Sequence, residues 1–512
     1  MSAWDPFDQN RHADFFDPEW MFGFRDGFDI VIGNPPYVRQ EAIKDQKAAL
    51  KPHYPHSYSG TADLYVYFYE RSFQLLNPHG TLSFITSNKW FRAKYGADLR
   101  QYMATHTRLR QIIDFGDEAV FDALAYPTIV IATKRDKPVA LVDAQNEVLA
   151  LNWDGGNEAF RVSDFPDVFA VERFAVPQSE LKPGGWQLEP PVKRRLLERL
   201  RKAGQPLGEY CKGRFYRGVL TGLNEAFVIT REQRDALVEQ DPQSAEIIKP
   251  YLRGRDIKRW HVEFEEQYLI KIESSENVEH LWSNLPLEKA EKKFAKTYPS
   301  VYAWLAVDGR RQQLIDRSDQ GKYFWELRSC AYWSEFENRK IVFPDIALSP
   351  QFAIDSNGHV LANTSYMIPD ADLVVLATLN SAVCAWFYSQ ISPQIQNGYF
   401  RFIAQYVSQI PIPPTVDKQR DAISAVCAVL DAGVSAPEYE RLLNGLVYEL
   451  FFPEDLHAKN IRLFDACAAA GIREGMDAQA VAARIFRNDH PIYGMLFDLP
   501  TLDVVRIIES LE

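Results

Sequence analysis

Cysteine is scarce in this sequence of 512 residues. Its five copies, Cys211, Cys330, Cys384, Cys427 and Cys467, are scattered, and no two have Cys-x-x-Cys spacing. The sequence therefore suggests neither a metal site nor a disulfide framework. Five free thiols fit a reducing compartment, so we expect a cytoplasmic protein.

Long apolar segments are also missing. No apolar run reaches the roughly 18 residues that a membrane-spanning helix needs. The N-terminal residues do not place a basic segment before an apolar one, which is the order that marks a signal peptide. We therefore expect no membrane partner.

Positive charge is in the minority, with 57 Lys and Arg against 69 Asp and Glu and a formal net charge of -12. Over the whole chain this balance argues against binding to nucleic acid. Such affinity is a property of a patch, however, and residues 191–260 hold 16 Lys and Arg against 9 Asp and Glu, a balance of +7. Residues 416–512 hold 9 against 16, a balance of -7. The middle of the chain is thus a candidate region for binding a polyanion.

Strand and helix patterns alternate over residues 1–135, which we expect to form an α/β domain. The predicted strands are the apolar or β-branched runs 28–33, 81–86, 109–115 and 127–133. The last two are close enough in the chain to pair antiparallel. Helices are predicted from Thr61 to about Leu76 and from about Lys89 to Thr105.

Three further segments differ in composition. Residues 136–190 contain Pro and Gly clusters, and we expect a linker with some strand. Residues 191–415 are aromatic and irregular with short β-like segments, and we expect an α+β domain. Residues 416–512 are Ala-rich and acidic with helical periodicity, and we expect a separate helical unit.

The strongest local signal is Asn34-Pro35-Pro36-Tyr37, which directly follows the first predicted strand. Asn and Pro also form ordinary surface turns, which is the simpler interpretation. Sites in open α/β sheets gather at the carboxyl ends of strands, however, and this motif lies at such an end. Its position favours a functional turn.

These residue types suit the chemistry of an exocyclic amine. The amino group of adenine is a poor nucleophile because its lone pair is delocalised into the ring, and two acceptors, one on each N–H, can rehybridise it. The Asn34 carboxamide oxygen and the Pro35 carbonyl can act as that pair, because Pro35 and Pro36 stiffen the turn. Tyr37 can stack on the base, which has to be flipped out of the duplex to reach the turn.

With these segments the sequence resembles the gamma-class adenine-N6 DNA methyltransferases, particularly the single-chain modification and type IIG restriction–modification kind, over roughly residues 10–415. The resemblance implies methyl transfer from S-adenosylmethionine to a flipped-out adenine at a defined sequence of double-stranded DNA, in a prokaryotic cell. It also implies that Asp14 and Phe15 hold the adenine ring of the cofactor. Phe121 would sandwich the flipped base opposite Tyr37; the alternative is a core residue that anchors its loop.

A glycine-rich turn that the family uses to bind the methionine end of the cofactor is missing from the sequence. Gly23 and Gly27 lie close together, but they precede a strand instead of joining a strand to a helix. We therefore expect residues 1–135 to be a partial catalytic domain, with an incomplete Rossmann-like methyltransferase sheet and an exposed edge. A companion chain or a missing N-terminal region would carry the glycine-rich loop. Without it, the chain should bind S-adenosylmethionine weakly or not at all.

The basic region contains two segments, 212–229 and 248–260, that mix Arg and Lys with Gly turns and aromatics. Such loops can hold phosphates by charge and read bases with Arg forks. Both segments resemble the TaqI-like target-recognition domain that follows the catalytic domain in this family. The candidate DNA-binding residues are Lys212, Arg214, Arg217, Arg253, Arg255, Lys258 and Arg259. For any one of them, a solvated surface charge is the simpler alternative.

Two functions stay open at this point. The first is a site-specific DNA adenine-N6 methyltransferase of a restriction–modification or phage-defence system, completed by the missing half. The second is a non-catalytic specificity subunit with a vestigial catalytic turn. The intact motif at 34–37, together with Asp14 and Phe121, favours the enzyme, because a pure specificity protein has no physical need for these residues.

Overall fold

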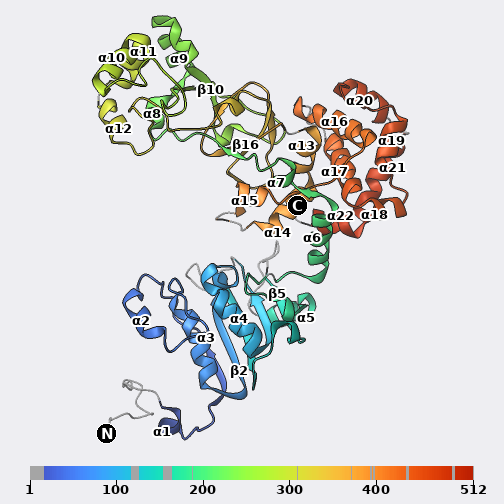
Figure 1. Cartoon of the computed structure of the whole chain (residues 1–512). Coiled ribbons are helices and arrows are strands. Elements are labelled where there is room, and N and C mark those ends of the chain that lie inside the picture. Colours follow the sequence, from blue (N-terminus) through green and yellow to red (C-terminus); the bar gives the residue numbers. More distant parts are fainter. Residues whose placement is uncertain are drawn as a thin grey trace. The chain divides into compact units, whose positions relative to one another are not determined.

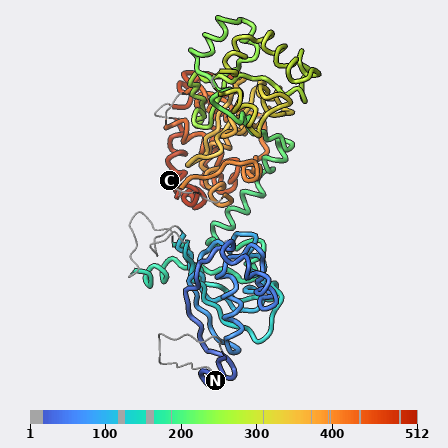
Figure 2. The backbone as a smooth tube through the Cα atoms, turned by 90° about the vertical axis from the view of Figure 1, so that its left-hand side faces the viewer, coloured from blue at the N-terminus to red at the C-terminus, as the bar shows by residue number. Residues whose placement is uncertain are grey.

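The computed structural model describes residues 17–116, 126–153, 164–186, 188–307, 309–370, 372–392, 395, 398–433, 437–486 and 490–510. They fold into two compact units, residues 1–195 and residues 196–512. The colours of Figure 2 run from blue to green through the first unit and from green to red through the second.

A six-stranded mixed sheet forms the centre of the first unit, in the order β1-β2-β4-β3-β5-β6. Its strands are β1 (Phe28–Gly33), β2 (Leu76–Ser87), β3 (Thr107–Asp114), β4 (Pro127–Lys134), β5 (Glu147–Asn152) and β6 (Phe174–Pro177). β1 pairs with β2 in parallel, β4 pairs antiparallel with β2 and β3, and β3 pairs in parallel with β5. The carboxyl ends of β1, β2, β3 and β5 therefore lie at the same end of the sheet.

This sheet confirms the expected α/β class and the four strands predicted within residues 1–135, including the antiparallel pair of β3 and β4. The segment 136–190, expected as a linker, adds β5 and β6 to the sheet. Val148, Ala150 and Val176 of these strands are buried in its core. The Pro and Gly clusters that suggested a linker lie at or after the end of β6.

Helices cover both faces of this sheet unequally. α3 (Leu64–Leu75) and α4 (Ala97–His106), which are neighbours in Figure 1, bury Phe73 and Met103 in the main core of the unit. α5 (Phe165–Glu172) packs on the opposite face, against a smaller cluster from the ends of β3 and β5. The remaining helices of this unit are short, namely α1 (Pro18–Phe22) and α2 (Lys47–Leu50).

The helix predicted from about Lys89 begins later, at Ala97. Two 3-10 turns, η2 (Asn88–Phe91) and η3 (Lys94–Gly96), precede it. Gly96 lies so close to the carbonyl oxygen of Trp90 that a Cβ atom at this position would collide with it. The chain therefore turns at a residue without a side chain before α4 starts.

The outer strand β1 has an open edge and an open face. No other described strand pairs with its free edge. Val31 packs against the core, whereas Ile30 and Ile32 on the other face are 67% and 78% exposed. Parallel strands in α/β sheets are normally covered on both faces. In the described residues, β1 is thus the exposed, apolar edge strand that the missing glycine-rich region predicts.

The second unit is a mixture of small sheets and helices, as expected for an α+β region. Its two larger sheets have the orders β15-β10-β11-β9 and β14-β12-β16-β8, and two further pairs are β13-β17 and β18-β7. The strands are β7 (Gln205–Pro206), β8 (Tyr216–Arg217), β9 (Val228–Thr230), β10 (Ile248–Leu252), β11 (Gln267–Ile270), β12 (Lys340–Pro344), β13 (Ile346–Ala347), β14 (Ala353–Asp355), β15 (Val360–Leu361), β16 (Ser365–Pro369), β17 (Phe400–Arg401) and β18 (Pro411–Ile412).

Helices form the rest of this part of the chain. They are α6 (Pro191–Ala203), α7 (Leu207–Tyr210), α8 (Asn224–Phe227), α9 (Arg231–Gln240), α10 (Leu287–Thr297), α11 (Pro299–Leu305), α12 (Arg310–Asp316), α13 (Leu373–Leu379), α14 (Ala382–Ile391), α15 (Ala404–Val407), α16 (Asp417–Asp431), α17 (Pro437–Phe451), α18 (Pro453–Ala458), α19 (Leu463–Ala469), α20 (Ala478–Ile485), α21 (Pro491–Asp498) and α22 (Asp503–Glu509). α9, α10 and α11 group together in Figure 1 around an aromatic core in which the rings of Phe294 and Trp325 stack at 5.2 Å.

The helical tail shares a core with the region before it. α16 and α17 contact α13, and buried residues of all four helices α13, α14, α16 and α17 belong to one continuous apolar cluster. The tail has the helices predicted for residues 416–512, but its apolar side is buried against α13 and α14. No single helix in the described part of the chain is long and apolar enough to span a membrane; α13 and α14 pass that test only as a pair bent by 60°.

A buried ionic network supports the sheet of β12, β14 and β16. Lys340 and Asp355 are almost fully buried, and Lys340 Nζ lies 2.6 Å from Asp355 Oδ2, while His359 Nδ1 lies 2.7 Å from Asp355 Oδ1. Burial alone would raise the pKa of Asp355, but hydrogen bonds from His359 and Lys340 outweigh it and hold the pKa at about 2. A carboxyl with a depressed pKa in the folded state stabilises the fold above its unfolded pKa, and this contribution is lost as the pH falls towards 2.

We expect Asp355→Ala to destabilise the second unit by about 3 to 5 kcal/mol, because it leaves the Lys340 ammonium buried without a counter-charge. Urea unfolding followed by tryptophan fluorescence measures the loss. The control is Asp370→Ala, which removes an exposed ion pair with Arg214 and should cost less than about 1 kcal/mol. Equal losses in the two variants would contradict a structural role for the buried pair.

Candidate catalytic turn and DNA-reading cleft

The Asn34–Tyr37 motif leaves β1 at the carboxyl end of the sheet. Pro35 is buried, whereas the Asn34 side chain is exposed, and no other residue of the described chain hydrogen-bonds to its carboxamide. The turn is anchored just beyond the motif, where Leu64 N donates to Val38 O at 2.9 Å. The backbone is thus held on both sides, by β1 and by the start of α3, while the Asn34 amide projects outward.

Tyr37 rests on the first turn of α3. Its ring meets the ring of Tyr65 edge-on at 6.1 Å, and its hydroxyl lies 3.5 Å from Ile85 O on β2. Partial burial raises the pKa of Tyr37, so the phenol is neutral at ordinary pH. About a third of the residue stays accessible, which leaves an aromatic surface beside Asn34.

Two further polar groups lie at the same end of the sheet. Asn88 follows β2, and its Nδ2 donates to Asp114 Oδ1 at the end of β3, at 2.8 Å. The same carboxylate oxygen accepts from Gly116 N at 3.1 Å. Neither Asn88 nor Asp114 belongs to a recognisable motif, so in the sequence only their positions at the ends of strands point to them.

The predicted cofactor and base-sandwich residues lie outside the described part of the chain. These are Asp14, Phe15 and Phe121. Their predicted roles therefore stay predictions.

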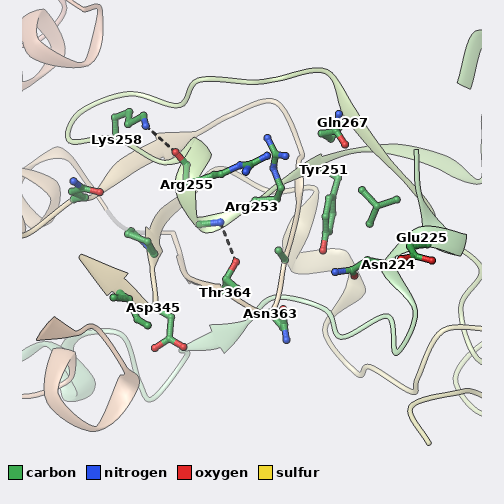
Figure 3. Close-up of a pocket in the computed structure, with 16 residues that line it drawn as sticks. Asn224, Glu225, Tyr251, Arg253, Arg255, Lys258, Gln267, Asp345, Asn363 and Thr364 are labelled. Carbon is green, nitrogen blue, oxygen red and sulfur yellow. Dashed lines mark hydrogen bonds between the residues drawn. The ribbon is translucent and has the colours of Figure 1, made fainter. Parts of the chain in front are cut away.

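A cleft of about 770 Å³ lies in the second unit, where residues after β10 face the turn after β15. Arg253, Arg255 and Lys258 contribute its cationic groups, and Figure 3 shows them on one side with Asn224 and Gln267 on the other. The two predicted basic segments, 212–229 and 248–260, thus both supply lining residues to one cleft.

The arginines of this cleft are not equivalent. Arg253 Nη2 donates to Asp256 Oδ1 at 2.8 Å and also to Glu265, and the hydrogen bond with Asp256 raises the pKa of Arg253. Its charge is therefore neutralised within the protein. Arg255 is 68% exposed, and its nearest carboxylate oxygens, on Glu265 and Asp256, lie at 3.8 and 3.9 Å. Arg255 is the freer of the two cations.

The other candidate basic residues have varied surroundings. Arg259 Nη2 donates to Asn380 O at 2.6 Å and to Glu440 at 2.8 Å, so its guanidinium ties the loop to the helical tail. Arg214 pairs with Asp370 at 2.7 Å. Two further candidates bind backbone carbonyl groups: Arg217 Nε donates to Asn363 O at 2.7 Å, and Lys258 Nζ donates to Arg255 O at 2.9 Å.

Lys212 is exposed on the turn after α7, with φ of 54°, and does not line the cleft. The structure therefore brings Arg253, Arg255 and Lys258 together and leaves Lys212, Arg214 and Arg259 apart from them. The DNA-binding roles of all seven residues stay predictions.

Two protein families match this chain, one in each of its two units. Residues 4–121 match the model of the Eco57I restriction-modification methylase family, and residues 249–412 match the TaqI-like C-terminal specificity domain. This chain joins an Eco57I-type restriction-modification methylase segment to a TaqI-like specificity domain. The family expected from the sequence is thus confirmed, while adenine as the target base stays a prediction.

Relatives extend over both parts. The type II methyltransferase M.PaeR7I of Pseudomonas aeruginosa is 28% identical over 408 residues, which cover 76% of this chain and 65% of the relative. M.BstVI of Geobacillus stearothermophilus is 26% identical over 411 residues, which cover 75% and 67%. This chain thus spans about two thirds of the length of these methyltransferases.

Among solved structures, the type IIL restriction-modification enzyme MmeI in complex with DNA is similar, with 14% identity, a TM-score of 0.44, and coverage of 94% of this chain and 57% of that chain. The type IIG restriction endonuclease BpuSI has 14% identity and a TM-score of 0.37, with coverage of 94% and 53%.

We expect Arg255→Ala to weaken DNA binding and to lower the slope of log affinity against log salt by roughly 0.9, because one phosphate contact is lost. Fluorescence anisotropy with a labelled duplex, titrated at several salt concentrations, gives the slope. Arg506→Ala is the control, because Arg506 is 64% exposed but lies on α22 of the acidic tail. An unchanged slope for Arg255→Ala would move the phosphate contacts to another surface.

Proposed function

We propose that this chain carries the catalytic turn and the DNA-reading domain of a site-specific DNA methyltransferase that acts on the N6 amine of adenine, in a restriction–modification or phage-defence system. The observation that carries the proposal is the Asn34–Tyr37 motif at the carboxyl end of β1, inside the segment that matches a methylase family. The specificity domain that follows would select the DNA sequence. The cytoplasm of a prokaryotic cell is the proposed location.

The turn is suited to accept hydrogen bonds from an amino group. S-adenosylmethionine, when bound, supplies the methyl group. The exposed Asn34 carboxamide oxygen and the Pro35 carbonyl would each accept one N–H of the amine, which pulls its nitrogen towards a tetrahedral geometry. Because Pro35 is buried and Val38 is tied to α3, the backbone that carries both acceptors is held in place as the base arrives. The accessible part of Tyr37 would stack on a base flipped out of the duplex.

We expect Asn34→Ala to lower methyl transfer by roughly 100-fold or more, which is the scale of losing one preorganised hydrogen bond to a reacting group. The assay measures tritium transfer to duplex DNA with the region that carries the glycine-rich loop supplied. DNA affinity of the variant should equal that of the parent chain, because the cleft lies in the other unit. Methylation that survives the substitution would overturn the catalytic assignment of Asn34.

We further propose that the region with the glycine-rich loop docks on β1. Among the described residues no strand pairs with the outer edge of β1, and Ile30 and Ile32 offer an apolar face beside it. A strand added there would extend the parallel sheet, and its helices would cover the two isoleucines. About a third of the length of these relatives lies outside the part that aligns with this protein. The occupant is therefore a companion chain or an N-terminal region that completes the cofactor site.

We expect the double variant Ile30→Asp, Ile32→Asp to lose association with the companion region by more than about tenfold, because two carboxylates would be buried in an apolar contact. Isothermal titration with a separately expressed methyltransferase region that carries the glycine-rich loop measures the affinity. Val142→Asp is the matched control, since Val142 is 74% exposed in the same unit but away from β1. Full S-adenosylmethionine binding by the 512 residues alone would contradict the need for a companion.

A further inference from the structure

The turn at Asn363 is held by two separate segments of the chain, residues 252–254 and Arg217. It follows β15, and Ala362 N donates to Leu252 O at 2.7 Å. Arg217 Nε donates to the carbonyl oxygen of Asn363 at 2.7 Å, and Gly254 N donates to Thr364 Oγ1 at 3.1 Å, the bond dashed in Figure 3. The backbone that presents Asn363 is therefore fixed from both flanks of the cleft.

Two glycines let these segments approach the turn. A Cβ atom at Gly254 would lie 2.7 Å from the carbonyl oxygen of Thr364, and one at Gly218 would collide with the carbonyl group of Ala362. Backbone thus meets backbone on two sides of Asn363. A position supported in this way keeps its side chain aimed in one direction, which recognition of a base edge requires.

The side chain of Asn363 is not used by the protein itself. It lines the cleft and is partly exposed, and no hydrogen bond joins its carboxamide to another of the described residues. Asn380 shows the contrasting case of a structural carboxamide: it accepts from Phe352 N at 3.0 Å and donates to Phe352 O at 2.8 Å. Asn363 keeps both its donor and its acceptor for a ligand.

The neighbours of Asn363 in the cleft indicate the ligand. Arg255, whose side chain is 68% exposed, supplies the freest positive charge of the cleft, as a polyanion needs, whereas Arg253 is neutralised by Asp256 and Glu265. Lys258 Nζ lies 3.5 Å from Glu263, and the carboxylates of Glu225 and Asp345 also line the cleft. A free carboxamide presents a donor and an acceptor side by side, which matches N7 and the N6 amine of adenine in the major groove. Arg253 thus supports the loop through its ion pairs, whereas the Asn363 carboxamide is available to bind a base.

We infer that Asn363 is a specificity-determining residue that contacts the major-groove edge of an adenine in the recognition sequence. This inference rests on the proposed DNA-reading role of the specificity domain and does not depend on methyl transfer. Arg253 is a positioning residue for the loop that carries Arg255.

The test is selection of random-sequence duplexes by the full chain, followed by sequencing of the bound pool. The parent chain should select a motif with an adenine at a defined position. Asn363→Ala should lower the preference at that one base pair by about 5- to 150-fold, the scale of one bidentate base contact, and keep the other positions. Asn363→Asp, which replaces the donor by an acceptor, should shift the preference at that position towards cytosine, whose N4 amine donates.

Asn357→Ala is the matched control, because Asn357 is an exposed asparagine of the same domain that does not line the cleft. Its selected motif should equal that of the parent chain. An unchanged motif in both Asn363 variants would overturn the assignment of Asn363 and leave the proposed function intact. A parent chain that selects no motif would overturn the DNA-reading role, and the inference with it.

Discussion

The parallel pairing of β1 with β2 determines the position of the Asn34–Tyr37 turn at the carboxyl end of the sheet. In its register Ile32 lies beside Ser83 and Gly33 beside Phe84, so that Asn34 emerges level with the last residues of β2. The Tyr37 hydroxyl can then reach Ile85 O. A slip by one residue would turn Ile30 and Ile32 into the core and Val31 out of it. The same pairing therefore fixes both the exposed Asn34 and the uncovered apolar face.

In the second unit the corresponding constraint is that carboxylates of the protein itself neutralise several of its arginines. The basic balance of residues 191–260 suggests a broadly cationic surface, yet Arg214, Arg253 and Arg259 each pair with a carboxylate that lies far along the chain or in the next turn. These pairs hold loops in place and contribute little to an external field. What remains for a polyanion is a small number of exposed cations around one cleft, of which Arg255 is the clearest.

This difference explains which features could be predicted from the sequence. The strands of residues 1–135 and the Asn34–Tyr37 turn have local signatures, an apolar run and a rare four-residue string, and both are found where expected. β5 and β6 were read as part of a linker because they are short and lie among turn residues; pairing with β3 makes them strands. A single asparagine such as Asn363 has no signature at all. Its importance depends on Gly218, Gly254 and Arg217, which only the fold brings to it.

The helical tail was likewise expected to stand apart, because its composition differs sharply from that of the preceding residues. The acidic composition of residues 416–512 predicts a charged outer surface for α16 to α22, and their periodicity predicts that each helix has an apolar side. Neither identifies the partner of that side. The partner is the pair α13 and α14, which is apolar almost throughout and shares one buried cluster with the tail and with β12 and β16.

The shared core of α13, α14 and the tail limits where the specificity domain could be exchanged for another one. An exchange that ended at the Pro-rich strand β18 would separate α13 and α14 from the tail helices that pack on them. In the hybrid, α13 and α14 of one protein would have to pack against the tail helices of another, whose apolar side chains do not fit them. Selection should therefore favour exchanges that include the tail. The exchanged segment would then extend beyond residues 249–412, which match the specificity domain.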